Sequence, residues 1–195
     1  GTSDFGKELD SLTDFVSFGI APAFVIYFWE LNKLGKIGWL IVLLFSVCCV
    51  LRLARFNLTK FDYNEQWKIN FFEGIPSPAG GCLILFPLMF ELSNFSIFIN
   101  LKIITPYLAV LISFLLISKV PTFSFKKILI RRKMTIFLLL GVGLFFVSII
   151  QFTFETLTIC CLIYLTLIPI GIYNYKLQLK NVNKFIDEEE HQDIL

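Results

Sequence analysis

The residues best suited to chemistry lie in a polar stretch that runs directly into an apolar segment near the start of the chain. Gly6, Asp10 and Asp14 are spaced four residues apart, and Ser17 continues the stripe. On a helix this spacing puts them on one face, so two carboxylates point the same way at the edge of the apolar segment. Ionisable groups at such a depth are costly and usually face a cavity or a partner group rather than lipid.

The two aspartates have two interpretations. Carboxylate oxygens suit a hard divalent cation such as Mg²⁺ or Mn²⁺, and Gly6, without a side chain, would let a bulky substrate group approach one turn before Asp10. Alternatively, Asp10 and Asp14 cap and solvate the start of a helix, where the helix dipole favours acidic residues. Two carboxylates do not enclose a divalent ion, so the spacing alone leaves both interpretations open.

Further polar side chains follow the second apolar segment. Arg52 and Arg55 are three residues apart and lie roughly on one helix face, next to Asn57. The planar guanidinium group binds phosphate or carboxylate well, but arginines at this position also anchor a span at the membrane surface. The run 74–78, with Ser77 between two prolines, is either a rigid turn over a site or a plain loop turn.

The composition indicates a membrane protein. Of the 195 residues, 56% are hydrophobic and 16% are charged, against about 25% charged in an average soluble domain. Apolar runs of roughly 20 residues can cross a bilayer as helices, and the sequence has six. We therefore predict an all-α integral membrane protein with a membrane domain at 1–176 and a polar cytoplasmic tail at 177–195. The six runs are 12–31, 37–56, 79–98, 100–118, 134–152 and 155–175.

The distribution of basic residues supports this topology. Cytoplasmic loops carry an excess of Lys and Arg, and 14 of the 17 basic residues fall on one side if the six runs alternate across the membrane. Both chain ends then lie on that side, which we assign as cytoplasmic. The net charge of +2 does not indicate a nucleic-acid partner. The five cysteines lie inside apolar runs without metal-site or redox spacing, and we interpret them as packing residues.

Three further expectations concern the runs and their connections. Prolines interrupt three of the runs and are expected as tolerated kinks in continuing helices: Pro22, Pro87 and Pro169. The connection 58–78 is expected to be an ordered surface loop. Glutamates at the outer ends of three spans are interpreted as interfacial residues: Glu30, Glu91 and Glu155.

Four blocks of sequence resemble one family. Gly6, Asp10 and Asp14 match G-x-x-x-D-x-x-x-D, the second half of the signature of the CDP-alcohol phosphatidyltransferases. The blocks most resemble that family's CDP-diacylglycerol:serine O-phosphatidyltransferases and occur in the same order; they are SDFGKELDSL at 3–12, FGIAPA at 18–23, RLARFN at 52–57 and GIPSPAG at 74–80. The resemblance is specific over residues 3–80 and weaker beyond residue 130.

The resemblance implies a reaction and roles for the residues that match. It implies a two-metal site with Mg²⁺ or Mn²⁺, in which Asp10 is a metal ligand and Asp14 is the general base and possible second ligand. The substrates would be CDP-diacylglycerol and L-serine, and the products phosphatidylserine and CMP. Substrate-binding positions would be Gly6, Arg52, Arg55, Asn57 and Ser77. The resemblance also implies a homodimer in the inner or plasma membrane of a prokaryote, with its active site on the cytoplasmic face.

One part of the family signature has no counterpart. The first half, D-x-x-D-G-x-x-A-R, is absent, because no Asp-Gly pair occurs anywhere in the sequence. We therefore expect two further N-terminal membrane helices and an incomplete metal site in this chain. Other acceptors remain open, namely glycerol phosphate, inositol phosphate or choline. A non-enzymatic membrane protein such as a small transporter, or an inactive fragment, is also open.

Overall fold

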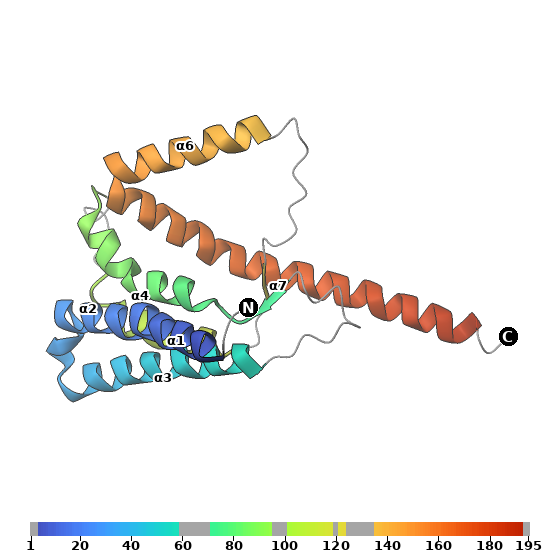
Figure 1. Cartoon of the computed structure of the whole chain (residues 1–195), viewed down its shortest axis with the longest axis horizontal. Coiled ribbons are helices and arrows are strands. Elements are labelled where there is room, and N and C mark those ends of the chain that lie inside the picture. Colours follow the sequence, from blue (N-terminus) through green and yellow to red (C-terminus); the bar gives the residue numbers. More distant parts are fainter. Residues whose placement is uncertain (1–3, 59–70, 95–100, 119–120, 124–134, 193–195) are drawn as a thin grey trace.

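The computed structural model describes residues 4–58, 71–94, 101–118, 121–123 and 135–192, and within these ranges it is almost entirely helical (Figure 1). The first helical stretch consists of α1 (Asp4–Asp14), a π-helix (Phe15–Ile20) and α2 (Ala21–Trp29). A short 3₁₀ turn (Leu31–Leu34) leads into α3 (Lys36–Leu58). The remaining helices are α4 (Ser77–Leu92), α5 (Thr105–Ile117), α6 (Thr135–Gln151) and α7 (Thr153–Gln192).

A proline explains the π-helix between α1 and α2. Pro22 lies in the first turn of α2, and the backbone N–H of Ala21 donates to the carbonyl of Val16, five residues earlier. Proline lacks an N–H and its ring crowds the carbonyl four residues before it, so the wider π turn lets the helix continue. The expected continuation of the helices through proline is confirmed, because Pro87 lies inside α4 and Pro169 inside α7.

The chain is an integral membrane protein, and its apolar helices correspond to the six predicted runs. Within the described ranges, three segments are long and apolar enough to cross a membrane: Phe5–Trp29, Lys36–Asn57 and Thr153–Tyr173. The prediction of six spans of roughly 20 residues is met only in part, since α4, α5 and α6 have 16, 13 and 17 residues. The first helix also begins at Asp4, eight residues before the predicted run, because the polar stretch is itself helical.

Two short strands were not predicted. β1 (Phe71–Glu73) pairs antiparallel with β2 (Pro121–Phe123), with Phe72 opposite Thr122. Three-residue strands are too short for an alternating pattern to be visible in the sequence. They join the segment before α4 to the segment after α5. The predicted surface loop at 58–78 falls largely outside the described residues, and its described part contains β1.

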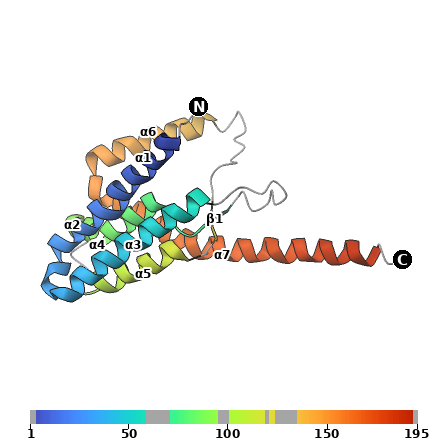
Figure 2. The same cartoon turned by 60° about the horizontal axis from the view of Figure 1, so that its bottom comes forward.

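The core lies between α2, α3, α4, α5 and α7 (Figure 2). It includes Ile26, Phe45, Leu83 and Ile112, all fully or almost fully buried. By contrast, α6 packs against α7 and has no buried residue, and most of its side chains are large and apolar. An exposed apolar surface of this kind is expected where a helix faces lipid.

The acidic residues at the outer ends of the helices have polar neighbours. Glu30 pairs with Lys33 at 2.8 Å, and Glu91 pairs with Lys102 at 2.7 Å. Glu155 accepts a hydrogen bond of 2.6 Å from Asn94. The hydrogen bond to Glu91 raises the pKa of Lys102 above its ordinary value. These contacts agree with the interfacial interpretation of the three glutamates, because each carboxylate interacts with a polar side chain at the end of a helix or in a connection.

Gly74 fixes the entry to α4. Its φ is +77°, a conformation that L side chains rarely adopt. A Cβ atom here would also lie 2.7 Å from the carbonyl oxygen of Ser118 and 3.0 Å from that of Leu116. The glycine therefore permits the turn and the close approach to the end of α5 that precede Ser77.

We expect Gly74→Ala to destabilise the protein by about 1–3 kcal/mol, because it combines backbone strain with a steric clash. Gly141→Ala is the matched control: nothing lies within 4 Å of a Cβ at this position in α6, and alanine is the better helix former by up to about 1 kcal/mol. Thermal unfolding in detergent should thus show a fall for the first variant and no change or a rise for the second. Equal stability of both variants would contradict this account.

Candidate active site

The two aspartates lie on the helical stretch that includes α1. Since α1 runs from Asp4 to Asp14, Gly6, Asp10 and Asp14 occupy one face, as predicted. Gly6 and Asp10 are exposed and Asp14 is half-buried. The capping interpretation is wrong: Asp10 lies six residues inside the helix, and the Asp14 side chain makes no capping hydrogen bond. The carboxylates therefore have no role in starting this helix.

Arg52 and Ser77 form the central polar contact. Arg52, near the end of α3, donates a hydrogen bond of 2.8 Å to the hydroxyl of Ser77, the first residue of α4. Ser77 is completely buried. The first turn of α4 is closed by the N–H of Gly80, which donates to the carbonyl of the N-cap residue Pro76 at 2.9 Å. The segment 74–78 is thus a defined turn that places a buried hydroxyl against a guanidinium group.

Further groups surround this contact. The charge of Asp14 acts on both Arg52 and Cys49, and the Cys49 thiol interacts with Ser77. Gly81 lets α4 approach the π-helix closely, since a Cβ there would lie 2.9 Å from the carbonyl oxygen of Phe18. Side chains from three helices therefore meet at one end of the bundle, with Asp10 one turn further out on α1.

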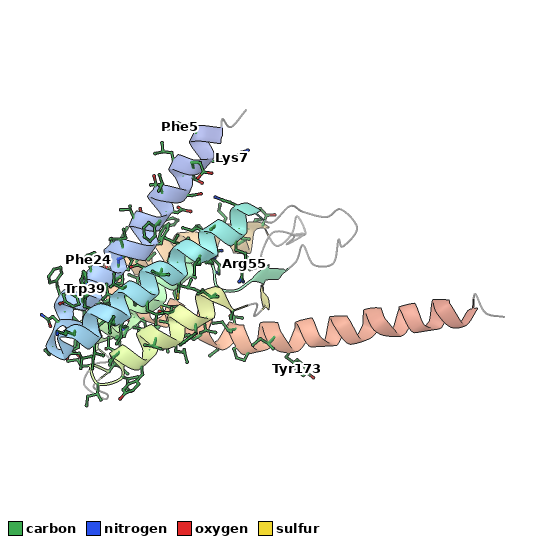
Figure 3. The ribbon with its side chains drawn as sticks, turned by 90° about the horizontal axis from the view of Figure 1, so that it is seen from below. Phe5, Lys7, Phe24, Trp39, Arg55 and Tyr173 are labelled. Atoms are coloured by element: carbon green, nitrogen blue, oxygen red, sulfur yellow. The ribbon has the colours of Figure 1, made fainter. Side chains whose placement is uncertain are left out.

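Arg55 and Asn57 make different contacts from Arg52. Arg55 donates to the carbonyl oxygen of Ile117, at the end of α5, at 2.9 Å. Figure 3 shows Arg55 near the C-terminal end of α3, whereas Phe24 and Trp39 lie at the opposite end of the bundle. Asn57 is exposed and donates to the hydroxyl of Ser11 on α1 at 2.9 Å. In these positions both side chains connect the end of α3 to a neighbouring helix.

The donor set fits part of a site for a hard divalent cation. Among the described residues, no group of three or more His, Cys, Asp or Glu side chains is placed to hold a metal ion. Asp10 and Asp14 supply two carboxylates one helical turn apart. Mg²⁺ commonly uses one or two carboxylates together with water and substrate phosphates. The part of the chain that the structure describes therefore offers two carboxylate ligands of such a site.

Two polar side chains of this region were missed by sequence reasoning. Cys49 was interpreted as a packing residue, and it is buried, but it also lies beside Ser77. Tyr164 of α7 interacts electrostatically with Arg52 from more than 100 residues along the chain. The signal available in the sequence was a tyrosine near the middle of the apolar run 155–175, which also contains Tyr173 and Tyr175 near its end. Nothing in that run indicated which helix Tyr164 faces.

Comparison with known proteins identifies a family that this sequence matches. The family model for CDP-alcohol phosphatidyltransferase matches residues 1–174. The CDP-diacylglycerol–serine O-phosphatidyltransferase of Mycobacterium leprae is 32% identical over 178 residues, which are 89% of this chain and 58% of the relative. The protein of the same name from Helicobacter pylori strain 26695 is 32% identical over 146 residues, covering 75% and 60% of the two chains. That of Methanocaldococcus jannaschii is 37% identical over 118 residues, covering 60% and 49%.

The chain is a member of the CDP-alcohol phosphatidyltransferase family, which confirms the resemblance drawn from the four sequence blocks. The matched region spans less than two thirds of the length of each of these relatives.

Proposed function

We propose that the protein transfers a phosphatidyl group from CDP-diacylglycerol to the hydroxyl of L-serine, giving phosphatidylserine and CMP. The observation that carries this proposal is the meeting of Asp14, Arg52 and Ser77 at one end of the bundle. Arg52 and Ser77 belong to two of the four sequence blocks typical of the serine enzymes, and Asp14 is the last position of the G-x-x-x-D-x-x-x-D motif. Relatives from three genera bear the name of those enzymes.

Asp14 is assigned as the general base. Its carboxylate takes the proton of the serine hydroxyl while the serine oxygen attacks the β-phosphorus of CDP-diacylglycerol. The new bond joins that oxygen to phosphorus, and the bond from the same phosphorus to the oxygen of CMP breaks. The half-buried position of Asp14 suits this role, because the carboxylate is reachable but lies within the field of the Arg52 charge.

Arg52 is assigned to bind the anionic part of a substrate, a phosphate or the serine carboxylate. Its guanidinium has five N–H donors, and Ser77 takes one of them. The remaining donors can form the paired hydrogen bonds that phosphate and carboxylate accept. Ser77 then orients the guanidinium. Gly6 leaves space beside Asp10, and Arg55 and Asn57 are assigned to the rim of the substrate site.

Asp10, together with Asp14, would hold Mg²⁺ or Mn²⁺. When bound, the metal ions supply neutralising charge for the pyrophosphate and for the leaving CMP. Further ligands of the proposed two-metal site would come from an upstream D-x-x-D-G-x-x-A-R segment, carried on two additional membrane helices. The coding sequence upstream of Gly1 tests this point, because its lack of that segment would remove the basis for a two-metal site.

We further propose that the six apolar helices are membrane-embedded, with the active site on the cytoplasmic face, and that the protein is a homodimer. The strong bias of basic residues to one side supports this orientation. The candidate site lies at the ends of α3 and α4 that this bias places on the cytoplasmic side. A transporter would instead need polar groups or broken helices near the middle of the membrane.

The test is release of CMP from CDP-diacylglycerol in detergent micelles with Mn²⁺, with and without L-serine. It should be run on this chain and on the chain in its natural full-length coding sequence. Serine-dependent release is the expected result for the full-length protein. If release depends instead on glycerol phosphate, inositol phosphate or choline, that compound is the acceptor in place of L-serine. No release with any acceptor from a folded protein would contradict the proposed enzyme class.

A further inference from the structure

The hydroxyl of Tyr164 is buried without a partner. Among the described residues, only its oxygen and that of Thr158 are buried side-chain polar atoms with no hydrogen-bond partner. Leaving such a group unpaired is costly, and unpaired buried groups in a native structure call for an explanation. Both residues belong to α7, but Tyr164 is the one that interacts with Arg52.

The surroundings of Tyr164 indicate which kind of partner is missing. Arg52 carries only N–H donors and already donates to Ser77 at 2.8 Å. A phenol is a good donor as well. Since α7 packs against α4, whose first residue Ser77 binds Arg52, the buried Tyr164 hydroxyl and the Arg52 guanidinium lie within electrostatic range of one another, and both offer donors. A group that accepts hydrogen bonds from both without supplying a proton is an anion, either a phosphate or a carboxylate.

We propose that the Tyr164 hydroxyl donates a hydrogen bond to the anionic substrate group that Arg52 binds. This inference rests on the proposed function and adds a substrate-contacting residue from α7, outside the sequence blocks that define the site. The anionic group is either the phosphate of CDP-diacylglycerol or the carboxylate of L-serine. In both cases α7 contributes a side chain to the site, and the last apolar helix takes part in substrate binding.

Tyr164→Phe tests the proposal, since it removes the hydroxyl and keeps the ring. Without ligand, the variant should unfold in detergent at the same temperature as the wild type or higher, because an unpaired buried group is lost. With ligand, it should bind CDP-diacylglycerol, or use L-serine as judged by KM, about tenfold more weakly, as expected for a hydrogen bond to a charged group. An unchanged or higher unfolding temperature together with weaker substrate binding distinguishes a substrate contact from a structural role.

The control is Tyr173→Phe, the same substitution on the same helix at a residue that is 65% exposed (Figure 3). It should leave ligand-free stability, CDP-diacylglycerol binding and the KM for L-serine unchanged. Weaker binding of CDP-diacylglycerol by Tyr164→Phe assigns the phosphate as the partner, and a raised KM for L-serine alone assigns the carboxylate.

Two other outcomes overturn the inference. If Tyr164→Phe lowers the ligand-free unfolding temperature and leaves both substrate readouts unchanged, the hydroxyl has a structural partner within the protein. If the full-length wild type neither binds CDP-diacylglycerol nor releases CMP, the proposed function fails, and the substrate contact fails with it. The wild-type binding measurement therefore distinguishes the two failures.

Discussion

Asp14→Asn is expected to lower serine-dependent CMP release by about 10²–10⁴-fold, the usual contribution of a general base. Asparagine has nearly the same size as aspartate but cannot take the proton of the serine hydroxyl. The substitution also removes the negative charge that acts on Arg52 and Cys49. The KM for CDP-diacylglycerol should change less than kcat, because the proton moves only in the reaction step.

Glu8→Gln is the matched control for Asp14→Asn. Glu8 is an exposed carboxylate of α1. It lies two residues before Asp10, so its side chain is on the opposite face of the helix. Its neutralisation removes the same charge from the same helix and should leave CMP release within about twofold, as for an ordinary surface change. Full activity of Asp14→Asn, in a protein that unfolds at the wild-type temperature, would rule out the role of base.

Asp10 should respond differently from Asp14. If it holds a metal ion, Asp10→Asn raises the Mn²⁺ concentration needed for half-maximal release, and added Mn²⁺ restores part of the activity. No concentration of Mn²⁺ should restore Asp14→Asn to the same degree, because a missing base is not replaced by metal. Full restoration of both variants by Mn²⁺ would instead make Asp14 a ligand only, without the role of base.

Local periodicity explains why the sequence predicted the arrangement of the aspartates. Residues four apart share a helix face whenever the helix forms, so Gly6, Asp10 and Asp14 needed no tertiary information. The capping interpretation failed because it required knowing where the helix begins. The polar stretch of α1 lacks an apolar pattern, so hydropathy placed the start of the helix near residue 12 rather than at Asp4.

Long-range contacts explain what the sequence did not predict. Arg52 and Arg55 are three residues apart and were grouped as one pair, yet Arg52 contacts the start of α4 and Arg55 the end of α5. Side chains three residues apart on a helix point in directions that differ by about 60°, which is enough for Arg52 and Arg55 to reach different neighbours. The partners are separated by 25 residues for Arg52 and Ser77, and by more than 100 for Arg52 and Tyr164. Contacts between residues this far apart in the sequence depend on how the helices pack, which the local sequence pattern does not predict.

Arg52→Lys should lower kcat/KM by about 10–100-fold, since a hydrogen bond to a charged group contributes about 1.5–3 kcal/mol. Lysine keeps the positive charge but loses the planar set of donors that binds Ser77 and an anion together.

Arg55→Lys is the comparison, because the Arg55 guanidinium donates to the Ile117 carbonyl. We expect it to lower the unfolding temperature more than kcat/KM. A larger loss of kcat/KM in Arg55→Lys than in Arg52→Lys would transfer the anion-binding role to Arg55, and Ser77 would then be a structural partner only.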